Sequence, residues 1–154
     1  MKNKKRAFTL VEVVISLTIG VIVMSLVASL IVIVTNISNK QTYETQCQTE
    51  YQQASQFVET YFNNYQLDEF ELYSVSQNQV TIKNDNDEFE LSFDFEQKKL
   101  VAEMIDHTTN QVETLEISLK KIVEIKFSAN GNLIVCEYLF NDFPTYSNLV
   151  TFGV

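Results

Sequence analysis

Glycine, proline and histidine are scarce in this chain, which has three glycines, one proline and one histidine among 154 residues. Three glycines cannot supply the glycine-rich loop that binds phosphate groups, and the single histidine, His107, lies in a polar Thr/Asn/Gln segment without a catalytic partner. Two cysteines, Cys47 and Cys136, have neither the number nor the spacing of a zinc site. We therefore expect no enzymatic activity, no metal and no cofactor.

Basic side chains are also few, with 11 lysines and arginines against 20 acidic residues, and four of the 11 lie within residues 1–7. Without residues 1–7 the chain would have seven basic and 20 acidic side chains, a net charge of −13. A surface so acidic repels phosphate backbones, so we expect no direct binding to nucleic acid. A role in a machine that moves DNA stays open, because another subunit would contact the DNA.

One long apolar run is present, from residue 13 to residue 34, and it contains no charge and no proline. About 20 apolar residues span the hydrocarbon core of a bilayer as a helix. Four basic residues precede the run and the next lysine is Lys40, so the positive-inside rule predicts a single pass with a cytoplasmic N-terminus and an extracellular C-terminal domain. A cleaved secretory signal would have a shorter apolar region and a small-residue cleavage site.

Glu12 interrupts the apolar segment at its cytoplasmic end. A carboxylate within a membrane helix costs about 2.5–3.5 kcal/mol on insertion scales, so such a residue usually has a partner and a function. A plain membrane anchor would explain the apolar run and the basic head, but it would not explain Glu12.

The segment from Arg6 to Glu12, Arg-Ala-Phe-Thr-Leu-Val-Glu, resembles the class III signal of type IV pilins and pseudopilins. The resemblance implies that a prepilin peptidase cuts between Ala7 and Phe8 and methylates the new α-amino group of Phe8. It places Glu12 fifth in the processed chain. Ala7 departs from the family, which has glycine before the cut.

In a staggered filament, the resemblance implies that the N-terminal amine of an incoming subunit meets Glu12 of a subunit already in place. The two opposite charges would attract each other strongly in that low-dielectric setting. The alternative is that Glu12 reaches the membrane interface or is protonated.

The segment 36–65 predicts an amphipathic helix, because apolar residues recur at steps of three and four. The stripe consists of Tyr43, Cys47, Tyr51, Ala54, Val58, Tyr61 or Phe62, and Tyr65. With the apolar run it would form one long helix from about Phe8 to Tyr65. The expected organisation is a leader at 1–7, a transmembrane and assembly helix at 8–35, the amphipathic helix at 36–65 and an antiparallel β domain at 66–154.

Strand signals follow the helix, and the clearest is the alternation of apolar and polar residues from Phe89 to Phe95. Asn130-Gly131 predicts a hairpin turn with positive φ. The acidic run 85–88 lacks the glycine and the terminal glutamate of a calcium loop, so we interpret it as a turn. The expected strands lie at 71–76, 79–83, 88–95, 98–105, 112–119, 122–128, 133–135 and 149–152, which is enough for one modest sheet packed on the helix stripe.

The expected fold class is therefore α+β, with a long N-terminal helix packed on an antiparallel β-sheet, as in pilins. The resemblance implies a minor pilin or pseudopilin of a type IV-like pilus, similar to ComGF-like subunits of competence pili, with other pilins, the prepilin peptidase and the membrane as partners. The alternative function is a membrane-anchored extracellular binding protein that does not polymerise. Cys47 and Cys136 would form either a disulfide or two buried thiols.

Overall fold

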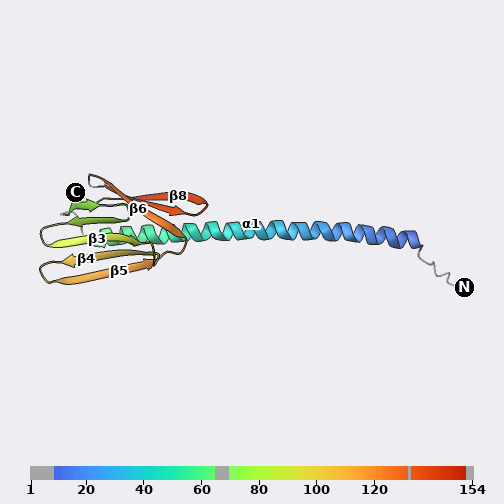
Figure 1. The fold of residues 1–154 in the computed structure, drawn as a ribbon, viewed down its shortest axis with the longest axis horizontal. Helices are drawn as coiled ribbons and strands as arrows, with labels where there is room; N and C mark the ends of the chain where they lie inside the picture. Colours follow the sequence, from blue (N-terminus) through green and yellow to red (C-terminus); the bar gives the residue numbers. More distant parts are fainter. Residues whose placement is uncertain (1–8, 65–69, 132, 152–154) are drawn as a thin grey trace. The chain divides into compact units, whose positions relative to one another are not determined.

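The structure is a computed structural model that describes residues 9–64, 70–131 and 133–151 (Figure 1). The chain divides into two compact units, an N-terminal unit, Met1–Tyr43, and a C-terminal unit, Glu44–Val154. Helix α1, Leu10–Asn64, contributes to both units, and all of the strands belong to the C-terminal unit.

The N-terminal unit consists of the first part of α1, and every side chain from Thr9 to Thr42 is exposed. From residue 13 to residue 34 the helix is apolar on all sides, a property of helices that are buried in a core or in a membrane. Its hydroxyls bond back to the helix backbone, as when Thr18 Oγ1 donates to the Val14 carbonyl at 2.9 Å. By length and composition α1 contains a segment that could cross a membrane.

In the C-terminal unit, α1 buries one stripe of side chains. The buried residues recur at steps of three and four, as the sequence predicts, and they are Cys47, Ala54, Ser55, Val58, Tyr61 and Phe62. Tyr43 and Tyr51 on the expected stripe are half-buried, and Tyr65 lies outside the described residues.

The first sheet is an antiparallel meander of five strands in sequence order. Its strands are β1 (Glu71–Val75), β2 (Gln79–Lys83), β3 (Asp87–Asp94), β4 (Lys99–Asp106) and β5 (Gln111–Ser118). In β3 the buried residues are Phe89, Leu91 and Phe93, so the predicted alternation is confirmed up to Phe93, whereas Phe95 lies in the following turn and is exposed. Asp94 and Asp106 end their strands alike, because each carboxylate accepts hydrogen bonds from two backbone N–H groups of the following turn.

The second sheet has three antiparallel strands, β6 (Ile122–Asn130), β7 (Leu133–Phe140) and β8 (Phe143–Thr151). The predicted turn at Asn130-Gly131 is confirmed, because Asn130 pairs with Leu133 and Gly131 has a φ of 59°. The structure corrects three expectations from the sequence. The strands form two sheets instead of one, β7 continues to Phe140 instead of residue 135, and the last strand begins at Phe143 instead of residue 149.

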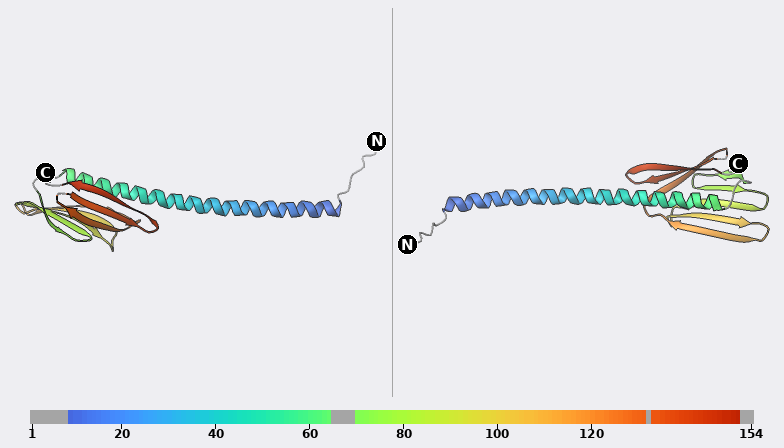
Figure 2. Two further views of the ribbon diagram at one scale, coloured as in Figure 1. Left: turned by 90° about the horizontal axis from the view of Figure 1, so that it is seen from above. Right: turned by 180° about the vertical axis from the view of Figure 1, so that it is seen from behind.

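Figure 2 shows α1 running alongside the sheets of the C-terminal unit, and the core consists of buried side chains from α1 and from both sheets. On the side of the first sheet, the rings of Tyr61 and Phe89 lie 5.0 Å apart. On the side of the second sheet, the rings of Tyr51 and Tyr138 meet edge to face at 5.4 Å. A long helix packed with antiparallel sheets is the predicted α+β, pilin-like architecture.

Candidate functional site

Glu12 closes a hydrogen-bonded cap at the first turn of α1. Its Oε2 accepts the backbone N–H of Thr9 at 2.9 Å and the hydroxyl of Thr9 at 3.0 Å. In return the Glu12 N–H donates to Thr9 Oγ1 at 3.3 Å. This reciprocal pair is a capping box, which satisfies two N–H groups that have no partner within the helix.

The contribution of Thr9 was not predicted, although the sequence has its signal, a threonine three residues before a glutamate at the start of an apolar run. Ala7 and Phe8, the expected cleavage and methylation site, lie outside the described residues, so that site stays a prediction. The cap holds the Glu12 carboxylate at the positive end of the helix dipole, a favourable position for a negative charge. Both contacts from Thr9 use Oε2.

A second glutamate, Glu50, binds a segment far away in the sequence. Its carboxylate accepts three successive backbone N–H groups, from Lys120 at 3.0 Å, Lys121 at 2.6 Å and Ile122 at 3.2 Å. These residues connect β5 to β6, so Glu50 fixes the junction between the two sheets to α1. The only sequence signal for this role was an acidic residue next to the buried stripe, between Cys47 and Ala54.

A chain of buried hydrogen bonds joins the second sheet to α1. The Tyr138 hydroxyl donates to Asn148 Oδ1 at 3.1 Å, and Asn148 Nδ2 donates to Ser55 Oγ at 2.9 Å. The Ser55 hydroxyl then donates to Glu59 Oε1 at 3.0 Å. Burial raises the pKa of Tyr138 far above its usual range, so this residue is a neutral donor.

Cys47 and Cys136 are both buried and both are thiols in the structure, so the disulfide considered from the sequence is not formed here. In the β7–β8 ladder Cys136 lies opposite Asn148, and the Asn148 side chain donates a hydrogen bond to Ser55 of α1. Ser55 is eight residues from Cys47, about 12 Å along a helix, whereas bonded cysteines have Cα atoms at most about 7 Å apart. Burial raises the pKa of Cys136 to about 12.

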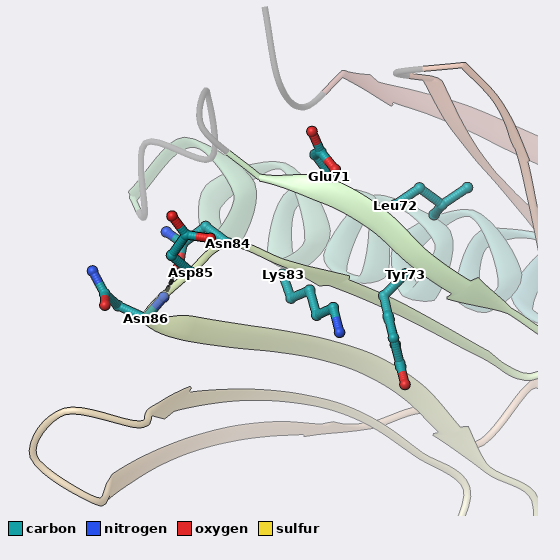
Figure 3. A pocket seen from close by; sticks show the side chains of 7 residues that line it. All are labelled: Glu71, Leu72, Tyr73, Lys83, Asn84, Asp85 and Asn86. Carbon is teal, nitrogen blue, oxygen red and sulfur yellow. Dashed lines mark hydrogen bonds between the residues drawn. The ribbon is translucent and has the colours of Figure 1, made fainter.

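A hollow of about 560 Å³ lies beside β1 and the β2–β3 turn (Figure 3). The Lys83 ammonium lies 3.5 Å from the centre of the Tyr73 ring, a cation–π contact at an exposed site. Asn84 Oδ1 accepts the N–H groups of Asn86 at 2.8 Å and Asp87 at 2.6 Å, so the first half of the acidic run is a turn, as predicted, and its second half begins β3. Among the described residues no group of three or more His, Cys, Asp or Glu side chains could hold a metal ion.

His107 lies in the β4–β5 turn with an exposed side chain, and its Nε2 is 3.5 Å from Glu88 Oε2. Next to it, hydrogen bonds from the hydroxyls and backbone of Thr109 and Thr108 hold the pKa of Asp106 well below its usual value. These contacts shape the turn.

Residues 2–28 match the family model of the prokaryotic N-terminal methylation motif. The matched range includes the basic head, the Thr9–Glu12 cap and the first part of the exposed apolar helix. Searches of curated proteins and of solved structures gave no match.

Proposed function

Since residues 2–28 carry the class III signal of type IV pilins and pseudopilins, we propose that this chain is a minor pilin or pseudopilin, a structural subunit of a type IV-like pilus. The observation that supports it best is the combination of this signal with Glu12 at the start of the apolar segment 13–34, whose side chains are all exposed. Such a surface needs a bilayer before assembly and neighbouring helices after it.

The processing steps belong to this proposal. A prepilin peptidase removes residues 1–7 and methylates Phe8, the domains are as expected at 8–35, 36–65 and 66–154, and the C-terminal unit lies outside the cell. Mass spectrometry of the native N-terminus tests this step. A chain that begins with methylated Phe8 is expected, and an intact Met1 in cells that contain the peptidase would contradict it.

Glu12 is proposed to bind the N-terminal amine of the next subunit, and the cap suggests how to separate this role from helix stability. Glu12→Gln keeps the shape and an amide oxygen that can cap Thr9, but it removes the charge. Thr9→Ala removes the capping partner and keeps the charge. We expect Glu12→Gln to lower the amount of the subunit in sheared filaments and Thr9→Ala to leave most of it.

Total membrane levels of both variants serve as the control, because neither change should prevent insertion. Equal losses from filaments for both variants would mean that the cap, and not the charge, determines incorporation. Normal incorporation of Glu12→Gln would reject the charge pairing.

Among pilus systems, we favour a competence pilus for DNA uptake, with a ComGF-like minor pseudopilin as the nearest kind of subunit. The strongly acidic C-terminal unit would leave contact with DNA to other subunits. The second candidate function is a membrane-anchored extracellular binding protein that does not polymerise, and the hollow beside β1 is the feature that favours it. Absence of the chain from sheared filaments of cells that express it would select this alternative.

A further inference from the structure

The two sheets present four edges, β1 and β5 in the first sheet and β6 and β8 in the second. An edge strand exposes backbone N–H and C=O groups that can pair with a strand of another chain. Proteins usually prevent such pairing with short strands, bulges, lysines or prolines on the edge.

Three of the four edges carry such protection. Strand β1 has five residues and its register shifts between Leu72 and Ser74. Strand β6 has a register shift near Ile122 and carries Lys126. Strand β8 contains Pro144 beside another register shift, and proline within a sheet is confined to edges and bulges.

Strand β5 has eight residues, no register shift, no lysine and no proline, and its charged side chains are Glu113 and Glu116. All eight of its residues pair with β4 in one unbroken register, from Gln111 opposite Asp106 to Ser118 opposite Lys99. It contains no glycine, and all of its side chains except Ile117 are exposed. A straight, exposed edge of this length is suited to the addition of another strand.

One face of β5 borders a partly apolar groove of about 460 Å³. Leu115 and Ile117 pair with Ala102 and Leu100, which are buried beneath α1, so all four share the face toward the helix. The groove is completed by five residues of α1, namely Gln53, Gln56, Phe57, Thr60 and Tyr61. Leu115 remains 43% exposed, so an added strand could cover it with apolar side chains of its own.

The other face of β5 has two carboxylates and one ammonium group, so it is acidic overall. Glu116 is exposed there and its Oε1 lies 2.6 Å from Lys99 Nζ, whereas Glu103 lies opposite Thr114 in the β4–β5 ladder. The C-terminal unit has 19 acidic and six basic residues, a net charge of −13. A second copy of this chain would bring acidic edges together, and like charges directly opposite each other destabilise a sheet.

We propose that β5 is a docking edge that accepts a β-strand from a different subunit of the same filament. The added strand presents apolar side chains to the groove and lysine or arginine side chains to the acidic face. This inference rests on the proposed function, because it takes its partner from the filament.

The first experiment places the photo-crosslinking amino acid benzoylphenylalanine at position 114 of the full chain, in cells that assemble the filament. Thr114 is exposed at the middle of the edge. Mass spectrometry of the adduct is expected to identify a different chain with its own N-terminal methylation motif. An adduct with a second copy of this chain, or no adduct although the chain is present in sheared filaments, would overturn the proposal.

The second experiment uses two variants of similar size and opposite charge, Thr114→Lys and Thr114→Glu. A basic partner strand predicts that Thr114→Lys lowers incorporation into filaments about fivefold relative to Thr114→Glu, the scale of one cross-strand charge pair. The reverse order would indicate an acidic partner and overturn the proposal. Ser74→Lys makes a similar charge change on the irregular edge β1, and an equal loss there would show a general charge effect and also overturn it.

The outcomes separate this proposal from the proposed function. If wild-type chain is absent from sheared filaments, the pilin function fails and the docking edge fails with it. If the chain is present in filaments but position 114 gives no adduct, only the docking edge fails.

Discussion

Removal of the charge of Glu50 tests whether this carboxylate of α1 holds the segment that joins the two sheets. Glu50→Gln keeps the length and shape of the side chain but replaces a carboxylate that accepts three backbone N–H groups with a neutral amide. Hydrogen bonds to charged groups contribute about 1.5–3 kcal/mol and neutral ones about 0.5–1.5 kcal/mol. One amide oxygen cannot replace two carboxylate oxygens, so at least one N–H group loses its acceptor.

Counting one lost bond and two weakened ones, we expect Glu50→Gln to reduce the free energy of unfolding by about 2–4 kcal/mol. The measurement is urea unfolding of the full chain in detergent micelles. With a slope of about 2 kcal/mol per molar urea, the midpoint should fall by about 1–2 M. Hydrogen exchange should accelerate first at the amides of residues 120–122.

Glu96→Gln is the matched control, because it makes the same chemical change on an exposed side chain in the β3–β4 turn. We expect it to alter the free energy of unfolding by less than about 0.5 kcal/mol. If Glu50→Gln does no more than this control, and exchange at residues 120–122 is unchanged, the carboxylate does not hold the junction.

Three further outcomes are expected. Asn148→Ala should destabilise the full chain by about 1–3 kcal/mol in thermal unfolding, because it leaves the buried Tyr138 hydroxyl without its acceptor. An unchanged melting temperature would contradict this. Burial and the nearby Glu103 and Glu88 carboxylates raise the pKa of Glu90, so ionisation of Glu90 destabilises the fold as pH rises through that pKa. Glu90→Gln should therefore raise the free energy of unfolding at pH 7 by a few tenths of a kcal/mol to about 1 kcal/mol. The gain should disappear in acid, where the wild-type carboxyl is protonated. A gain independent of pH would refute the charge explanation. Cys136, with its pKa near 12, should resist iodoacetamide at pH 8 in the folded chain and react in denaturant, whereas a mass lower by two hydrogens would reveal a disulfide instead.

The helix and most strands could be predicted because their signals are local. The apolar run from residue 13 to residue 34 and the stripe that includes Cys47 and Val58 repeat with the period of a helix. Phe89, Leu91 and Phe93 repeat with the period of a strand, and Asn130-Gly131 marks a turn by the conformations it permits.

The division into two sheets could not be predicted, because it depends on a contact across 70 residues or more. Nothing near Lys120 or Lys121 in the sequence indicates that their N–H groups bind Glu50. The early start of β8 was missed because Pro144 indicates the end of a strand unless the strand lies at an edge. The site at Glu12 was predicted from the free-energy cost of a carboxylate within a membrane helix, whereas its capping partner Thr9 was not predicted.

The position of Glu50 has a mechanical consequence for a subunit that carries load. Tension along a filament would reach the C-terminal unit through the backbone of α1, which enters that unit at Glu44. Glu50 lies within the next two helical turns and is tied to the segment between β5 and β6. A pulling force would therefore be shared by two sheets near its point of entry, and a subunit without this tie would yield by peeling one sheet at a time.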